Sequence, residues 1–326
     1  MSHERIVLLV GLGPTARAAV ESLALKLKVA AIVRTADDDD EVVELATHMG
    51  ISIVRDSSVA AVESAIAHWR PDCVVVSSFN RVFPSSTLKL CPFVNVHYAP
   101  LPRYRGRATV NWAIINHEPS TAVTIHRMEP GLDAGDVLFQ QQVAIGPDET
   151  VTSLYERLND LQREHLGATV QRFLDGDPGT PQRSEIATYC CTRIPEDGEI
   201  DWRTATRDTY ALIRALAPPF PGAFTYLDGE PLIVWKAQPL TDAPRYVGRI
   251  PGRVVFVSRG EGYVDVLAGD GVLRIHEVQL RSRPVQPPAE LIRSVRITLG
   301  LRAADLLGRI RQLEERFARL QALETI

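Results

Sequence analysis

The chain has 326 residues, of which 45% are hydrophobic and 23% are charged, ordinary values for a globular protein with room for two domains. Its formal net charge of -4 and pI of about 6.1 exclude a global positive field that would attract nucleic acid. No apolar stretch approaches the roughly 20 residues that cross a bilayer, and the first apolar run is too short for a signal peptide. We therefore expect a cytoplasmic protein with no membrane contact.

Strands and helices alternate in the first half of the sequence. Short apolar runs predict buried strands, and the segments between them have helical periodicity. Nearly continuous apolar strands separated by helices are typical of a parallel sheet that is covered on both faces, so we predict an α/β domain over residues 1–190. The predicted strands cover residues 6–10, 29–33, 51–54, 72–76, 94–97 and 122–128, and the predicted helices cover residues 14–28, 41–49, 59–69 and 150–176.

A glycine turn follows the first predicted strand. Residues 11–16, Gly-Leu-Gly-Pro-Thr-Ala, match the G-x-G-x-x-A fingerprint of dinucleotide-binding proteins in the expected strand–helix context. An NAD(P)-dependent oxidoreductase is therefore one hypothesis. However, no acidic residue stands cleanly at the tip of the second strand, and Pro14 is an ordinary first residue of a helix. A tight structural turn is the favoured interpretation.

The pattern changes after about residue 192, where short alternating strands and turn residues become frequent. Asp228-Gly229 lies between two such strands and is a strong hairpin signal. This pattern indicates a small β-barrel or open sheet over residues 191–300. The predicted strands cover residues 223–227, 232–236, 253–258, 263–267 and 272–280.

The last segment, residues 301–326, is predicted to be an amphipathic helix. One interpretation packs its apolar face on the helix's own domain. The other pairs this face with a second subunit as a short coiled coil, which would make the protein a homodimer. The apolar residues recur at spacings of four and three: Leu306, Ile310, Leu313, Phe317 and Leu320.

The four cysteines are Cys73, Cys91, Cys190 and Cys191. They show neither a C-x-x-C pair nor a metal-ligand spacing, which favours a reducing compartment and predicts no metal site. The adjacent pair Cys190 and Cys191 is expected to lie in a strand.

Three polar residues lie at predicted strand ends. Asn95 and His97 are two apart, so on a strand both side chains point to the same face, and a Pro- and Gly-rich loop follows them. Asp133 stands in a second glycine-rich loop behind the strand predicted over residues 122–128. Each residue alone has a structural explanation, as a turn former, a core histidine or a turn acid. Together, at strand ends of an α/β protein, they favour an active site.

The three side chains suit the steps of acyl transfer. The amide of Asn95 can donate hydrogen bonds to an oxyanion. His97 can pass protons near neutral pH, and Asp133 can orient its imidazole. No serine or cysteine nucleophile occurs in a recognisable setting, so we predict direct transfer without a covalent acyl-enzyme.

Several segments together carry a family resemblance. They are Asn95-x-His97, residues 101–106 (Leu-Pro-x-Tyr-Arg-Gly), residues 132–136 (Leu-Asp-x-Gly-Asp), and residues 197–202, 213–216 and 220–224 in the second half. These segments closely resemble the formyltransferase family that uses 10-formyltetrahydrofolate, of which methionyl-tRNA formyltransferase is the best-known member. The likeness covers nearly the whole chain and implies a Rossmann-like catalytic domain followed by an OB-like barrel. The family usually has serine and leucine where this chain has Ala99-Pro100.

The resemblance implies a role for each matching residue. His97 would be the general acid and base, Asn95 the oxyanion stabiliser and Asp133 the residue that tunes the histidine. 10-Formyltetrahydrofolate would be the formyl donor, and no metal would take part. Arg107 could instead be an ordinary surface arginine. Residues 81–83 could instead be a plain loop after a strand. The donor contacts that we predict are Arg81, Val82, Phe83, Arg107, Glu129, Pro130, Gly131 and Leu132.

Members of this family differ in the amine that receives the formyl group. The tRNA enzymes carry a basic, glycine-rich insertion after the second strand, whereas residues 35–41 of this chain read Thr-Ala-Asp-Asp-Asp-Asp-Glu. Such a segment would repel a phosphate backbone, although carboxylates at a helix start also favour the helix dipole. Residues 106–112 and 123–128 look closer to the branch that formylates nucleotide-linked amino sugars.

We therefore predict a small-molecule acceptor, a nucleotide-linked amino sugar, and no nucleic acid partner. Charged Met-tRNA is the first alternative acceptor, and an amino-acid-like metabolite is the second.

Overall fold

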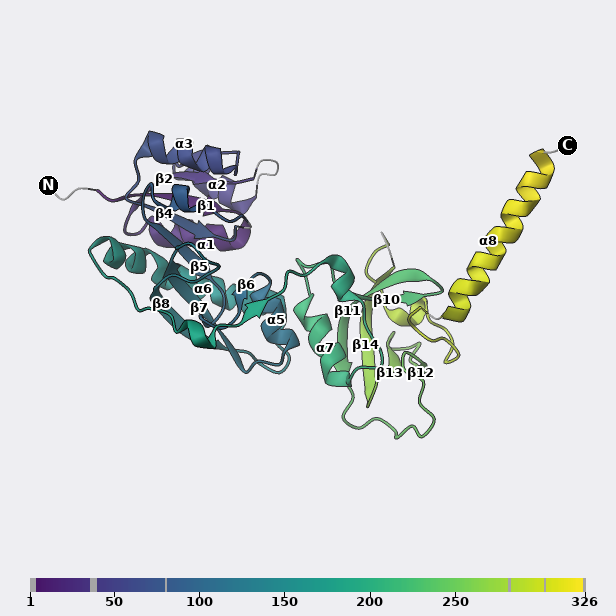
Figure 1. Ribbon diagram of the computed structural model, residues 1–326. Coiled ribbons are helices and arrows are strands. Elements are labelled where there is room, and N and C mark those ends of the chain that lie inside the picture. The colour runs from purple at the N-terminus through teal and green to yellow at the C-terminus, as the bar shows by residue number, and fades with distance from the viewer. Residues whose placement is uncertain (1–3, 36–39, 80, 281–282, 302, 325–326) are drawn as a thin grey trace. The chain divides into compact units, whose positions relative to one another are not determined.

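The computed structural model describes residues 4–35, 40–79, 81–280, 283–301 and 303–324 (Figure 1). The chain divides into two compact units, one of residues 1–113 and 118–193 and the other of residues 114–117 and 194–326. The division that we predicted at residue 190 lies close to the second of these boundaries. No helix in the described part of the chain is both long and apolar enough to cross a membrane.

The first unit is built on one seven-stranded sheet. The five strands β1 to β5 are parallel to one another, as the apolar runs predicted, and the α/β fold class is confirmed. The last two strands, β7 and β8, are antiparallel to their neighbours, so the sheet is mostly but not entirely parallel, in keeping with the parallel-rich sheet of the Rossmann-like domain that we expected. The loop that joins them, residues 128–136, is too short for the crossover that a parallel pair needs. The order across the sheet is β3 (Ser52–Val54), β2 (Lys28–Val33), β1 (Ile6–Gly11), β4 (Cys73–Ser77), β5 (Phe93–His97), β7 (Ser120–Arg127) and β8 (Val137–Ala144).

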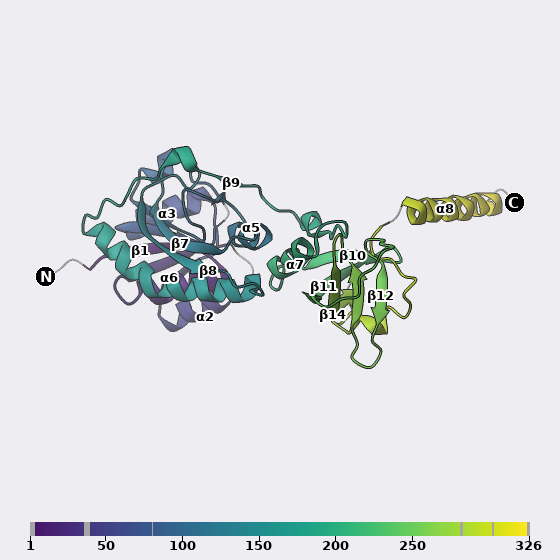
Figure 2. The same ribbon diagram turned by 90° about the horizontal axis from the view of Figure 1, so that it is seen from below.

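Helices cover both faces of this sheet. Helix α3 (Val59–Trp69) lies on one face, and α1 (Gly13–Leu23) lies on the other together with α6 (Val151–Leu174) (Figures 1 and 2). Helix α6 approaches α1 closely at Gly167, where an added Cβ would stand 2.3 Å from the carbonyl oxygen of Ser22. This contact holds the end of α1 closely against α6. The remaining elements of this unit are α2 (Glu41–His48), α4 (Ser85–Leu88), α5 (Thr109–Ile115), the 3-10 turn η1 (Ser184–Ile186) and the short parallel pair β6 (Arg105–Gly106) and β9 (Tyr189–Cys190).

The second unit is an antiparallel sheet with its own core. The hairpin signal at Asp228-Gly229 is confirmed, because both residues have the positive φ of a type I′ turn, 51° and 79°. Helix α7 (Thr206–Ala215) packs on this sheet, and apolar side chains such as Trp202, Leu232 and Ile292 belong to the buried core of the unit. The order is β10 (Ala223–Leu227), β11 (Glu230–Pro239), β14 (Val272–Leu280), β13 (Val264–Leu267) and β12 (Val254–Val257), with 3-10 turns η2 (Pro195–Gly198) and η3 (Pro288–Glu290) at its ends.

The chain ends in helix α8 (Ala303–Glu324). Those of its apolar side chains that the structure describes do not enter the core of the second unit. Five of them are between 45% and 62% exposed: Leu306, Leu307, Ile310, Leu313 and Phe317. The interpretation in which this face packs on its own domain therefore does not describe the structure.

Candidate active site

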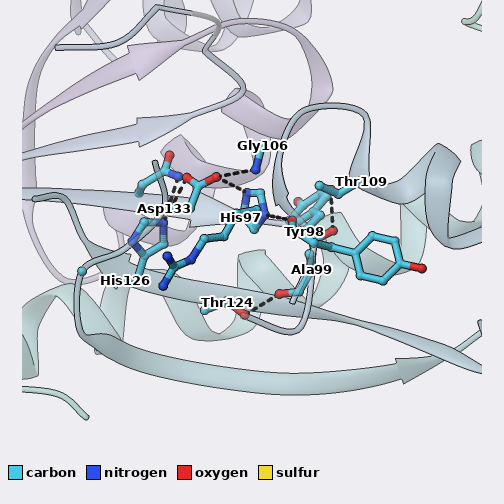
Figure 3. Close-up of polar contacts among 12 residues, drawn as sticks. His97, Tyr98, Ala99, Gly106, Thr109, Thr124, His126 and Asp133 are labelled. Carbon is cyan, nitrogen blue, oxygen red and sulfur yellow. Dashed lines mark hydrogen bonds and ion pairs between the residues drawn. The ribbon is translucent and has the colours of Figure 1, made fainter. Parts of the chain in front are cut away.

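The site is formed where β5 and β7 run side by side. Asn95 and His97 lie on β5, and the antiparallel register places His126 of β7 directly opposite Asn95. Asp133 comes from the loop between β7 and β8, so the sheet and this loop bring the four side chains together. Figure 3 shows the carboxylate of Asp133 between the rings of His97 and His126.

One nitrogen of His97 is committed to a backbone contact. Its Nε2 lies 2.8 Å from the carbonyl oxygen of Tyr104. Since a carbonyl oxygen can only accept, Nε2 must carry a hydrogen. The other nitrogen, Nδ1, faces Oδ2 of Asp133 at 3.7 Å. Proton exchange at this histidine can therefore take place only at Nδ1.

Asp133 is held at both its side chain and its backbone. Its Oδ2 accepts a hydrogen bond of 2.8 Å from the backbone N–H of Gly106, and its Oδ1 lies 3.7 Å from Nε2 of His126. The amide of Gln182 donates to the carbonyl oxygens of Asp133 and Gly135 at 2.8 and 2.7 Å. Asp133 has a φ of 48°, a left-handed conformation that aspartate tolerates better than most residues. These contacts fix the carboxylate beside the two rings.

His126 is a residue that the sequence analysis did not select. It is 1% exposed, and its Nδ1 and Nε2 lie 2.7 Å from the carbonyl oxygen of Arg127 and 3.1 Å from Nδ2 of Asn95. Burial, followed by the charge of His97, lowers the pKa of His126 to about 4, so the ring is neutral at pH 7. The available signal was its place on a strand beside Asn95, but this register becomes visible only once β7 is known to run antiparallel to β5.

A cavity of about 490 Å³ opens over these residues, a size typical of a small-molecule site. Ten of the eleven residues that we predicted line it: Asn95, His97, Asp133, Arg81, Val82, Phe83, Arg107, Glu129, Gly131 and Leu132. Pro130 is the exception, since it is not among the lining residues. Phe83 is buried and stacks on Phe79 with ring centroids 5.6 Å apart, so the cavity has a firm aromatic wall.

The glycine turn at the start of α1 has a structural explanation. An added Cβ on Gly11 would stand 2.0 Å from the carbonyl oxygen of Ser77, so glycine is needed where β1 meets β4. The N–H of Gly13 donates to the carboxylate of Asp40 at 3.0 Å, and Asp40 also caps α2. In dinucleotide-binding proteins the helix N–H groups at this point face a pyrophosphate. Here a side-chain carboxylate takes that place, which agrees with the interpretation as a tight turn.

Asp40 is also one of the acidic residues in segment 35–41. It pairs with the buried guanidinium of Arg34. Burial raises the pKa of Asp40, but hydrogen bonds from Arg34 and Gly13 outweigh it and lower the pKa overall. Asp40 is therefore a helix-start residue with a neutralising partner. The predicted repulsion of a phosphate backbone rests on Asp37, Asp38 and Asp39, which lie outside the described residues.

Sequence comparison matches two families over most of the chain. The family described as Formyl transferase matches residues 18–170, and the family described as Formyl transferase, C-terminal domain, matches residues 194–296. A methionyl-tRNA formyltransferase of Geobacter metallireducens is 34% identical over 265 residues, which is 79% of this chain and 82% of that protein.

Solved structures show the same fold at lower identity. HypX from Aquifex aeolicus in complex with tetrahydrofolic acid has a TM-score of 0.66 at 20% identity, over 89% of this chain and 47% of HypX, so this chain spans about half the length of that protein. WlaRD, a sugar 3N-formyl transferase solved with dTDP and 5-N-formyl-THF, has a TM-score of 0.62 at 16% identity, over 87% of this chain and 100% of WlaRD. At these identities, both comparisons show a shared fold and nothing more specific.

Proposed function

Because this chain belongs to the formyl transferase family, we propose that it transfers a formyl group to the amine of a nucleotide-linked amino sugar. The donor of the family is 10-formyltetrahydrofolate, and the chain is a folate-dependent N-formyltransferase. Family membership overturns the hypothesis of an NAD(P)-dependent oxidoreductase. The observation that carries the catalytic proposal is the convergence of Asn95, His97 and Asp133 on one cavity.

The cavity suits the donor. Its apolar wall of Val82, Phe83 and Leu132 matches the flat ring system of a folate, and Arg81, Glu129 and Gly131 line the cavity beside it. These residues would hold the donor. In the transfer, the acceptor nitrogen bonds to the formyl carbon, the bond from that carbon to N10 of the folate breaks, the acceptor loses one proton and N10 gains one.

Each catalytic side chain has one task in this scheme. Nδ1 of His97 accepts the proton from the acceptor nitrogen and returns it to the leaving nitrogen, while Nε2–H stays on the carbonyl oxygen of Tyr104. Asp133, 3.7 Å from Nδ1, stabilises the imidazolium that forms in between. The amide of Asn95 donates to the formyl oxygen as negative charge develops on it.

Charge supports a small acceptor over tRNA. Residues 1–193 hold 18 Lys and Arg against 23 Asp and Glu, a net charge of 18 − 23 = −5, which disfavours a long polyanion. Arg81 and Arg107 are exposed and line the cavity, where a guanidinium can bind a diphosphate with two hydrogen bonds. A compact diphosphate sugar meets both conditions.

Charged Met-tRNA is the second candidate acceptor. The observation in its favour is the 34% identity to a methionyl-tRNA formyltransferase over 82% of that protein's length.

One assay separates the two acceptors. The protein is incubated with 10-formyltetrahydrofolate and, separately, with TDP-, UDP- and GDP-linked amino sugars or Met-charged initiator tRNA, and the release of tetrahydrofolate is followed. We expect kcat/KM for one sugar nucleotide to exceed that for tRNA, and His97→Ala to lower it by roughly 10²–10⁴-fold. The exposed His48→Ala variant is the matched control. Turnover of tRNA at a competitive rate would assign the enzyme to the second candidate.

We further propose that α8 makes the protein a homodimer. In heptad notation Leu306 and Leu313 take position d and Ile310 takes position a, a combination that favours two parallel strands. A parallel pair also brings Arg309 at position g opposite Glu314 at position e of the second copy. An antiparallel pair would instead align arginines at position g. The exposed apolar face and this charge complementarity support a second copy of the chain as its partner.

A further inference from the structure

We propose that His126 is a positioning residue, which holds the amide of Asn95 in the one orientation that leaves an N–H free for the formyl oxygen. The proposal rests on the formyl transfer argued above and adds a residue to it. Its basis is a chain of three hydrogen-bonding groups that begins at a backbone carbonyl and ends at the cavity.

This series of hydrogen bonds begins at the backbone carbonyl of Arg127. Nδ1 of His126 lies 2.7 Å from the carbonyl oxygen of Arg127, which can only accept, so Nδ1 carries a hydrogen. The ring is neutral, and Nε2 is therefore left with a lone pair. Nε2 lies 3.1 Å from Nδ2 of Asn95, and only an amide N–H can donate there. The orientation of the amide thus follows from the direction of a backbone carbonyl on the neighbouring strand.

The surroundings keep His126 in this tautomer. The ring is 1% exposed, and the rings of His97 and His126 meet at 88° with centroids 6.4 Å apart. The charges of His97 and Arg105 oppose a proton on His126, whereas Asp133 favours one. Burial is the largest of these influences on the pKa of His126, so Nε2 remains an acceptor at neutral pH.

The amide orientation matters because the two ends of an amide have opposite effects on an oxyanion. Nδ2 carries two hydrogens; one is bound to His126, and the other is available to the formyl oxygen. A rotated amide would present Oδ1 to the developing negative charge and repel it. Loss of one well-placed oxyanion donor typically lowers kcat by about 10²–10³-fold. Partial loss of orientation should lower it by about 10-fold or more.

The first experiment reads the tautomer directly and requires no acceptor. The ¹⁵N-labelled full-length protein is studied by NMR through the two-bond couplings between ring nitrogens and ring protons. We expect His126 to be neutral with the hydrogen on Nδ1 at pH 7. A hydrogen on Nε2, or a charged ring, would overturn the proposal whatever the acceptor is.

The second experiment is a double-mutant cycle in the formyl transfer assay. We expect His126→Leu to lower kcat by about 10-fold or more with KM for the donor within about twofold, and His126→Gln, whose Oε1 can accept from Asn95, to recover much of the loss. In an Asn95→Ala background, His126→Leu should have no further effect on kcat, because it acts only through the amide. Thr121→Val, a buried change on the same strand, is the matched control and should retain activity.

The outcomes are distinguishable. An additive cycle, or equal loss in the Leu and Gln variants, would overturn the positioning role even if the protein is active. Absence of turnover by the unaltered protein with every acceptor would contradict the proposed function and leave the tautomer measurement to decide this inference.

Discussion

At the scale of single residues, two backbone carbonyls determine how the two histidines work. Tyr104 occupies Nε2 of His97 and leaves Nδ1 for proton exchange, whereas Arg127 occupies Nδ1 of His126 and leaves Nε2 as an acceptor. Two histidines of one site thus carry their hydrogens on opposite ring nitrogens, Nε2 in His97 and Nδ1 in His126. His126 is 1% exposed, and this burial lowers its pKa to about 4.

This burial should make stability depend on pH. In the unfolded chain a histidine takes up a proton as the pH falls below about 6.5, whereas His126 in the folded protein does so only near 4. Its stabilising contribution is therefore complete above pH 6.5 and is lost as the pH falls toward 4. We expect the free energy of unfolding to fall by up to ~3 kcal/mol more over this range than in His126→Gln.

Urea denaturation at pH 7, 5.5 and 4.5 checks this expectation. His48→Gln, at an exposed position, should keep the slope of the unaltered protein. Identical slopes in the unaltered protein and in His126→Gln would show that His126 is not neutral in the fold.

At the scale of elements, the loop between β7 and β8 is positioned by a residue far away in the sequence. Gln182 donates to the carbonyl oxygens of Asp133 and Gly135, and its own Oε1 accepts from Arg105 at 2.8 Å. The hydrogen bond from Arg105 determines which end of the Gln182 amide faces the loop. The position of the Asp133 loop therefore depends on Gln182, which lies just before β9.

Removal of this contact should affect turnover more than stability. We expect Gln182→Leu to lower kcat by about 10-fold, because a small displacement of a catalytic group has large effects on rate. Gln182→Glu should also be impaired, since a carboxylate cannot donate to the two carbonyl oxygens. Steady-state kinetics and thermal denaturation measured together would test this, and a variant with full kcat would contradict it.

The glycine turn offers a second test at this scale. Gly11 has no room for a Cβ, whereas the space around Gly13 is open and only its φ of 68° disfavours other residues. We expect Gly13→Ala to cost about 1–2 kcal/mol of stability and Gly11→Ala to cost more, because the strands must move apart. Chemical denaturation of both variants checks the order. Equal costs would indicate that β1 and β4 adjust freely.

At the scale of the whole molecule, α8 presents an apolar face that its own unit does not cover. A parallel pair of these helices would bury Leu306, Ile310 and Leu313 and join Arg309 of one copy to Glu314 of the other. Association through the end of the chain would leave the catalytic unit of each copy unchanged.

Sedimentation of three proteins tests this dimer. We expect the full chain to be dimeric, truncation after Leu301 to be monomeric with formyl transfer retained, and Arg309→Glu to weaken association severalfold. Combining Arg309→Glu with Glu314→Arg should restore it, because the pair is then reversed. An unchanged oligomeric state on truncation would exclude α8 as the contact.

The sequence by itself determined the α/β class, most strand and helix positions, the turn at Asp228-Gly229 and the family, because these depend on apolar periodicity and on short contiguous motifs. It also selected Asn95, His97 and Asp133. It did not predict β8, the antiparallel direction of β7, or His126 and Gln182. Those depend on which strands become neighbours and on where backbone carbonyls point. Because hydrogen-bond direction is a property of folded geometry, the tautomers of His97 and His126 were decided only by the tertiary structure.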